Sequence, residues 1–264
     1  MKKSLFDLLS MLNNNLPVSA DSEHDLFGFA DAHDFAQAQD SFQYKQADID
    51  FLIFYFSNEF DISLLDEKTR ALFELSVNAF DAIIHAWMSE LPIEAEIIAF
   101  GRRVFKEAEK TNGAEAGRLA AENAACDRTC ADTLTVMNAV YKVQHEAHRI
   151  TGFLRFSPNE QGCYVARCAP DHFILPALGE YFTARFGETA WQIIDEKRNL
   201  ILNCRPPESA KIALKTDADG GQKGDEWENL WRHYHKTINN ESRNNPDLQR
   251  RFMPMRYRKY LPEM

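Results

Sequence analysis

The chain has 264 residues, of which 45% are hydrophobic, 12% aromatic and 27% charged, proportions that are ordinary for a soluble globular protein. Its 19 Phe and 4 Trp can form a substantial core, which excludes disorder throughout the chain. The longest apolar run, 51–56, has six residues and is too short for a transmembrane helix, which needs about 20. The sequence opens without a signal-peptide pattern and its five cysteines are odd in number, so we expect free thiols and a cytoplasmic location.

Charge is distributed unevenly along the chain. The formal net charge is −10, but residues 1–100 include 5 basic and 18 acidic residues, whereas residues 232–264 include 8 basic and 3 acidic residues. The first third would therefore repel a polyanion such as nucleic acid, and the C-terminal end could bind one. The alternative is that folding scatters these charges over the surface.

The first part of the chain predicts helices. Ser4 could cap a short helix with four leucines on one face, and 19–48 is predicted to be a polar loop. The run 51–56 is apolar throughout, so periodicity does not decide between a buried strand and a helix. We expect one helix over 66–88 and another that begins at Pro92, because apolar residues recur there at helical spacing.

A mixture of strands and helices is predicted for the second half. The expected core has two strands, a helix capped by Asp171 and two more strands: 152–156, 163–167, 171–186, 191–194 and 199–202. Residues 205–224, rich in Pro, Gly and Asp, predict a surface loop, and 225–238 predict a helix. The order β-β-α-β-β, flanked by N-terminal and C-terminal helices, predicts an α+β fold with a mainly antiparallel sheet.

Two histidines continue the apolar stripe of an expected helix that begins near residue 131. The inward stripe is predicted at helical spacing, and both imidazoles should then be mostly buried: Leu134, Met137, Tyr141, His145 and His148. The i, i+3 spacing of the histidines differs from the i, i+4 spacing of a zincin helix. They could be hydrogen-bonded core residues, or a pair at a pocket edge that binds phosphate together with Arg149.

Other polar residues are weaker candidates for chemistry. Glu146 precedes Arg149 by three residues and is expected to form a surface pair with it. If the chain is an enzyme, its catalytic residues could come from the histidine pair and from four further positions: Asp171, His172, Asp195 and Arg198.

The cysteines do not indicate a metal site. Cys126 and Cys130 have C-x₃-C spacing, without the further ligands that a zinc or iron–sulfur site needs. The sequence also lacks a nucleophile elbow, a phosphate loop and a glycine-rich dinucleotide motif, which removes support for hydrolase, nucleotide-triphosphatase and Rossmann functions. We therefore predict neither a metal nor a cofactor.

The C-terminal tract combines five cations with three aromatic residues: Arg250, Arg251, Phe252, Arg256, Tyr257, Arg258, Lys259 and Tyr260. Cations neutralise phosphates and aromatic rings stack on unpaired bases, so this mixture is typical of a contact with single-stranded or distorted nucleic acid. The alternative is an arm that docks its aromatic rings on the core and leaves its cations in solvent. Upstream, the helical spacing of Trp227, Trp231 and Tyr234 favours a packing face over a stacking platform.

Several ordered motifs resemble a bacterial family of unknown biochemical role: Val143–Arg149 with Gly152–Phe156, Pro170–His172, Trp191–Asp195 with Arg198, and Arg250–Pro254 with Lys259–Pro262. The family is described as a DNA metabolism or repair protein. Its genes neighbour that of a radical-SAM protein, and some members are fused to a uracil-DNA-glycosylase-like domain. The resemblance covers about residues 91–264 and leaves 1–90 as a divergent, acidic, mostly helical region.

Three functions are compatible with these features. The resemblance and the basic-aromatic tract together imply an accessory protein that binds DNA, possibly damaged or single-stranded in form, for a radical-SAM partner. An enzyme that acts on a nucleobase or nucleotide through a histidine-lined pocket is the second hypothesis. A protein-interaction scaffold that uses the acidic first third is the third.

Overall fold

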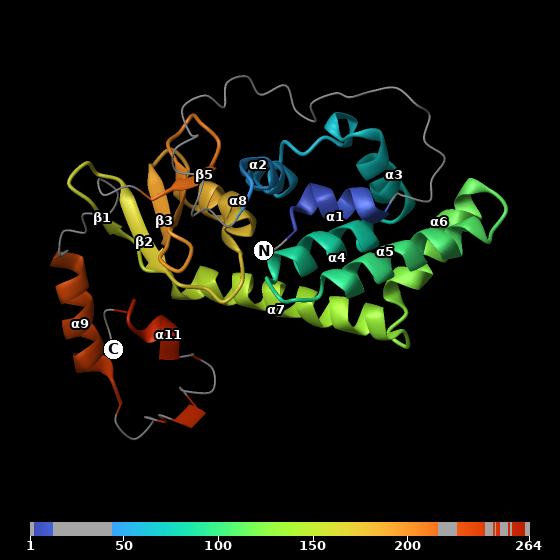
Figure 1. Ribbon diagram of the computed structural model, residues 1–264. Coiled ribbons are helices and arrows are strands. Elements are labelled where there is room, and N and C mark those ends of the chain that lie inside the picture. The colour runs from blue at the N-terminus through green and yellow to red at the C-terminus, as the bar shows by residue number, and fades with distance from the viewer. Residues whose placement is uncertain are drawn as a thin grey trace. The chain divides into compact units, whose positions relative to one another are not determined.

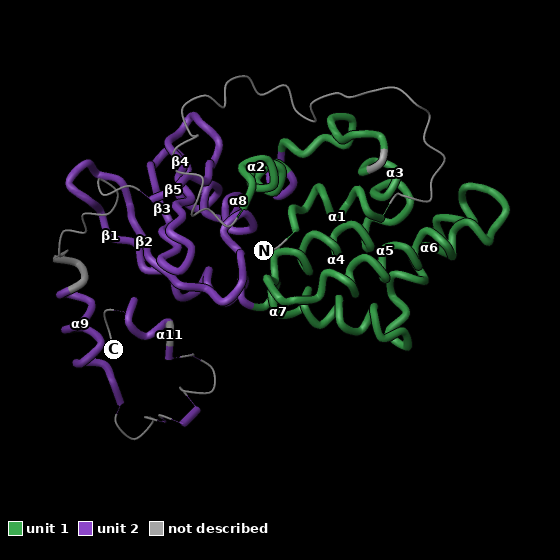
Figure 2. The backbone as a smooth tube through the Cα atoms, in the orientation of Figure 1, with its two compact units in different colours: residues 1–54, 59–145 green, residues 55–58, 146–264 purple. Residues whose placement is uncertain are grey.

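The computed structural model describes residues 3–12, 44–215, 226–240, 245, 247–248, 253 and 255–261. The chain divides into two compact units within one long helix, α7 (Ala131–Phe153). The first unit contains residues 1–54 and 59–145, and the second contains 55–58 and 146–264 (Figure 2). This division falls at 145/146, well beyond the boundary at 90/91 that the extent of the resemblance suggests.

The described residues of the first unit are helical. Its elements, besides the start of α7, are α1 (Leu5–Leu12), α2 (Gln46–Tyr55), the 3-10 helix η2 (Ile62–Leu64), α3 (Glu67–Leu75), α4 (Val77–Met88), α5 (Glu94–Glu109) and α6 (Ala114–Cys126) (Figure 1). The apolar run 51–56 thus belongs largely to a helix rather than to a strand. All four leucines of α1 are at most 3% exposed, as their spacing predicts. The side chain of Leu12 lies against Gly101 of α5, where a Cβ atom would come within 2.7 Å of it.

The single helix expected over 66–88 is two helices, because Ser76 interrupts it. Ser76 has an extended backbone, and its Oγ accepts the backbone N–H of Ala79 at 3.0 Å. A serine that bonds to an N–H group three residues ahead competes with the helical pattern and starts a new helix.

A five-stranded sheet forms the centre of the second unit (Figure 1). Its strands, which lie side by side in chain order, are β1 (Ser157–Pro158), β2 (Tyr164–Cys168), β3 (Trp191–Asp195), β4 (Leu200–Cys204) and β5 (Lys211–Leu214). β2 and β3 are parallel and the other neighbours are antiparallel. The predicted α+β fold with a mainly antiparallel sheet is therefore confirmed.

Helix α8 (Leu175–Phe186) connects the two parallel strands and covers one face of the sheet. Phe182 and Phe186 pack on Trp191, with ring centroids 5.9 and 6.3 Å apart. All five residues of β3 are buried. After the sheet come the helices α9 (Glu226–Ile238) and α11 (Met255–Arg258). None of the described helices combines the length and the hydrophobicity that crossing a membrane requires.

Three local predictions for this unit are wrong. Residues 152–153 end α7 instead of starting a strand, so β1 begins only at Ser157. α8 begins at Leu175, with a proline in its first turn, and is not capped by Asp171. The predicted loop 205–224 contains β5, because residues 211–214 pair with the edge of β4.

We predict that Ser76→Ala lowers the free energy of unfolding by about 0.5–2 kcal/mol, the usual cost of losing an N-cap. Urea unfolding measures the change. Ser10→Ala is the matched control, since the exposed Ser10 hydroxyl only donates to the Asp7 carbonyl within its own helix. Equal effects of the two substitutions would contradict the capping role of Ser76.

Candidate functional site

The buried side of α7 carries a carboxylate. Val136, Val140, Val143 and Ile150 are at most 5% exposed, and Glu146 lies on the same side with 4% of its surface exposed. Glu146 is therefore a buried residue, and the surface pair with Arg149 that its spacing suggests is a wrong prediction. A buried carboxylate needs hydrogen-bond donors, and the structure supplies them.

The predicted burial of the histidine pair is wrong. His145 and His148 are both exposed, and Leu134 and Tyr141 of the expected stripe are 46% and 65% exposed. Each residue advances a helix by roughly 100°, which places this stripe opposite Val143. The His145 ring stacks on Tyr141 at 5.4 Å, on the solvent side of α7.

Glu146 holds two separate parts of the second unit. Its Oε1 accepts the backbone N–H of Asp171 at 2.9 Å and the hydroxyl of Tyr257 at 2.6 Å, and its Oε2 accepts the backbone N–H of His172 at 2.8 Å. Burial raises the pKa of Glu146, but these three hydrogen bonds outweigh burial and the pKa is lowered overall. The ionised carboxylate thus fixes both the turn at 171–172 and the C-terminal helix α11.

A second buried carboxylate holds the same turn from the end of β3. Asp195 is fully buried and pairs with Arg198, whose Nη1 lies 2.7 Å from Asp195 Oδ2. The same guanidinium donates to the carbonyls of Pro170 at 3.2 Å and Asp171 at 2.9 Å. Burial raises the pKa of Asp195, and Arg198 limits the rise. The structure therefore assembles Asp171, His172, Asp195 and Arg198 around one turn, through backbone groups of the first two.

Glu196 anchors the last described residues of the chain. Its Oε2 accepts the hydroxyl of Tyr260 at 2.6 Å and lies 3.1 Å from Lys259 Nζ, while Oε1 lies 3.6 Å from the guanidinium of Arg167. Burial raises the pKa of Glu196, but the contacts with Tyr260, Lys259 and Arg167 lower it overall. Leu261, which follows, is 4% exposed.

The predicted nucleic-acid tract is thus partly a docked segment. Tyr257 is 2% exposed and packs on Phe153 at 5.4 Å, so its ring does not face solvent, and the guanidinium of Arg149 lies over the same Phe153 at 5.9 Å. Arg258 is half-buried, and its Nε and Nη2 atoms are buried without a hydrogen bond. Four of the predicted contacts lie outside the described residues or have undescribed side chains: Arg250, Arg251, Phe252 and Arg256.

Helix α9 displays the exposed aromatic surface of the second unit. Trp231 and Tyr234 are 43% and 49% exposed, with ring centroids 5.7 Å apart. Arg232 and Lys236 are exposed on the same helix, on one flank of the apolar stripe. The sequence favoured a packing role for these aromatics. Only their exposure, which sequence does not contain, distinguishes a surface from a core stripe.

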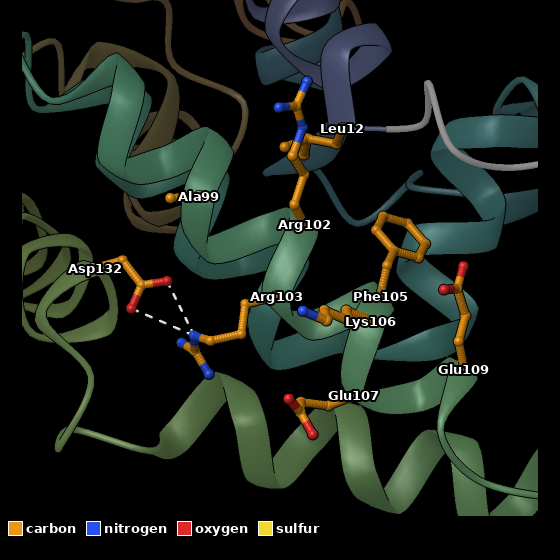
Figure 3. Close-up of a pocket in the computed structure, with 9 residues that line it drawn as sticks. All are labelled: Leu12, Ala99, Arg102, Arg103, Phe105, Lys106, Glu107, Glu109 and Asp132. Carbon is orange, nitrogen blue, oxygen red and sulfur yellow. Dashed lines mark hydrogen bonds and ion pairs between the residues drawn. The ribbon is translucent and has the colours of Figure 1, made fainter.

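A pocket of about 660 Å³ in the first unit is closed chemically by its own charges (Figure 3). Its lining includes three cations and three carboxylates. Arg103 Nε bonds both oxygens of Asp132, at 3.0 and 3.3 Å, and its Nη1 donates to the carbonyl of Ala124 at 2.9 Å. These bonds tie α5 to α6 and to the start of α7, which indicates a structural role.

Among the described residues no group of three or more His, Cys, Asp or Glu side chains is placed to hold a metal ion. Cys126 is exposed, Cys130 is half-buried, and both are free thiols. Cys168 is fully buried between charged groups, and burial raises the pKa of its thiol, so that the thiol stays protonated.

Comparison with known proteins supplies a family. A family model described as a domain of unknown function, DUF4130, matches residues 116–263, more than half of the chain. No curated protein and no solved structure matches the chain. The match covers α7, the sheet, α9 and α11, and hence every contact of Glu146 and Asp195 described above.

We predict that Glu146→Gln flattens the acid dependence of stability. The folded pKa of Glu146 is below its ordinary value of 4.5, so the stability it contributes is fully present above about pH 4.5 and is lost as the pH falls through the folded pKa. Urea unfolding from pH 7 to pH 3 should show the variant less stable by about 1–3 kcal/mol at pH 7 and less different at pH 3. Parallel curves would contradict this role. His148→Ala, at an exposed position, should stay within about 0.5 kcal/mol of the parent.

Removing the Tyr257 hydroxyl should cost about 1–3 kcal/mol, because a buried carboxylate loses a donor. Tyr257→Phe tests this in the same unfolding measurement and retains the ring contact with Phe153. Tyr141→Phe is the control, since Tyr141 is 65% exposed. If Tyr257→Phe matched the control, the docking of α11 through Glu146 would be wrong.

Proposed function

Since the chain belongs to the family described as a domain of unknown function, DUF4130, we propose that it is a nucleic-acid-binding protein of DNA metabolism. The proposed contact is α9, with its exposed aromatic rings and cations. The observation that carries the proposal is the half-exposed pair Trp231 and Tyr234 beside exposed Arg232 and Lys236.

The chemistry of this helix matches an unpaired strand. Aromatic rings stack on any base, and cations neutralise the phosphates between bases, so the combination binds single strands with little sequence preference. Trp231 and Tyr234 lie on one side of α9, with His235, Arg232 and Lys236 following around one flank. A strand could therefore stack on the rings while its phosphates face the cations.

The surrounding charge supports the same ligand. Residues 232–264 include 8 basic and 3 acidic residues, whereas the first hundred residues are strongly acidic. A polyanion would be attracted to the C-terminal part and repelled by the N-terminal part. The contacts of Tyr257 and Tyr260 with Glu146 and Glu196 hold α11 on the second unit, so the remaining cations of the tract stay near it.

The resemblance suggests the setting in which such binding is used. We propose that the chain is an accessory that presents DNA to a radical-SAM partner. The iron–sulfur chemistry would belong to that partner. Binding of nucleic acid by this chain does not depend on the partner and can be measured alone.

We predict salt-dependent binding of single-stranded DNA, measured as fluorescence anisotropy of a labelled oligonucleotide over a salt series. Trp231→Ala or Tyr234→Ala should weaken binding by about 1–3 kcal/mol and leave the salt dependence unchanged, because stacking carries no charge. Replacing Arg232 and Lys236 together with Ala should reduce the slope of log affinity against log salt by about 1.4, from two lost phosphate contacts.

Matched controls are available on the other unit. Tyr141→Ala removes an exposed ring, and Arg118→Ala with Lys142→Ala removes two exposed cations. These variants should bind as the parent does. The proposal fails if the α9 variants and the controls bind equally, or if α9 binds anionic vesicles and the protein binds no oligonucleotide, since amphipathic helices with basic flanks also bind membranes.

A further inference from the structure

A second pocket lies in the second unit, where the end of α7 approaches α8. It has a volume of about 250 Å³, and its lining includes Arg155, Phe156, Tyr181, Phe182 and Arg185. This volume is at the lower end for small-molecule sites, which favours a ligand of the size of one nucleotide over a larger cofactor.

An aromatic cluster forms one wall of this pocket. The Phe156 ring lies 5.1 Å from Phe182 and 4.7 Å from Phe186, so it is held from two sides by α8. Tyr181 meets Phe182 edge to face at 5.0 Å, yet remains 47% exposed. The pocket therefore has a fixed apolar wall and an exposed ring at its rim, which suits a flat heterocycle.

The charge of the pocket is positive. Among the described residues its lining includes two arginines and neither Asp nor Glu. Arg155 Nη1 donates to the carbonyl of Gly152 at 2.9 Å, which offsets the negative end of α7. Arg185 is exposed in the last turn of α8, one helical turn after Tyr181, so its guanidinium and the Tyr181 ring lie on one face.

We propose that this pocket binds a nucleoside monophosphate unit, with the phosphate on Arg185 and Arg155 and the base against Tyr181. Guanidinium groups bind phosphate oxygens in a fixed fork, and an aromatic ring beside them binds the base. The unit could be a free nucleotide or the phosphorylated end of a strand. The pocket shares no residue with the α9 surface, so binding of a free nucleotide does not depend on the proposed function.

The test is calorimetric titration of the full chain with dAMP, with deoxyadenosine and with inorganic phosphate. We expect dAMP to bind at least tenfold more tightly than either part. Arg185→Ala should weaken dAMP binding by about tenfold or more, the usual effect of removing a charged hydrogen-bond donor. Tyr181→Leu should weaken dAMP binding by about fivefold or more without changing the affinity for phosphate.

Controls and oligonucleotides separate the remaining possibilities. Arg118→Ala and Tyr141→Leu, at exposed positions of the other unit, should leave dAMP binding unchanged. An Arg185-dependent preference for a 5′-phosphorylated over a 5′-hydroxyl oligonucleotide would assign the pocket to strand ends. Binding of dAMP without that preference would assign it to free nucleotides.

The proposal is overturned if millimolar dAMP does not bind, if deoxyadenosine binds as tightly as dAMP, or if Arg185→Ala has no effect. Arg185 and Tyr181 are exposed, so neither substitution removes a core residue, and an unchanged thermal unfolding curve verifies folding. Loss of oligonucleotide binding in the α9 variants, with dAMP binding retained, would show that the two sites are independent.

Discussion

The carboxylate of Glu146 connects three segments of the second unit that are distant in sequence. Its hydrogen-bond donors are 25, 26 and 111 residues away, in the turn at Asp171 and His172 and at Tyr257 in the C-terminal helix. Burying a carboxylate without donors is costly, so the helix end, the turn and α11 stabilise one another. Arg198, paired with Asp195, holds the same turn from the sheet, and the position of the turn is therefore determined twice.

This constraint separates the roles of chemically similar residues. Tyr257 is used to satisfy a buried carboxylate and contributes to the fold. Tyr234 remains half-exposed on α9, beside cations, where it can contact a ligand. Tyr181 stands at the rim of a small positive pocket. The same side chain thus anchors, stacks on a strand or encloses a nucleotide, depending on the partner that the fold places beside its ring and hydroxyl.

Much of the fold could be predicted because it depends on local periodicity. The leucines of α1 are spaced for one face of a helix, and strands 191–194 and 199–202 were placed within two residues of β3 and β4. The α+β class follows from the order of such elements. The candidate site was predicted less well, because it depends on contacts rather than on patterns. The residues of the turn were correct, but their backbone amides carry the interaction.

The sequence by itself determined the fold class, most helices and strands, and the accumulation of positive charge at the C-terminal end, since each depends on neighbouring residues alone. Only the tertiary structure decided which side of α7 is buried. The stripes through Tyr141 and through Val143 are both partly apolar, and the second is buried because it has packing partners and because distant donors make a buried Glu146 tolerable. Likewise residues 211–214 are a strand only because β4 offers an unpaired edge. Burial of a charge and pairing of an edge are properties of two segments together, and no single segment of sequence contains them.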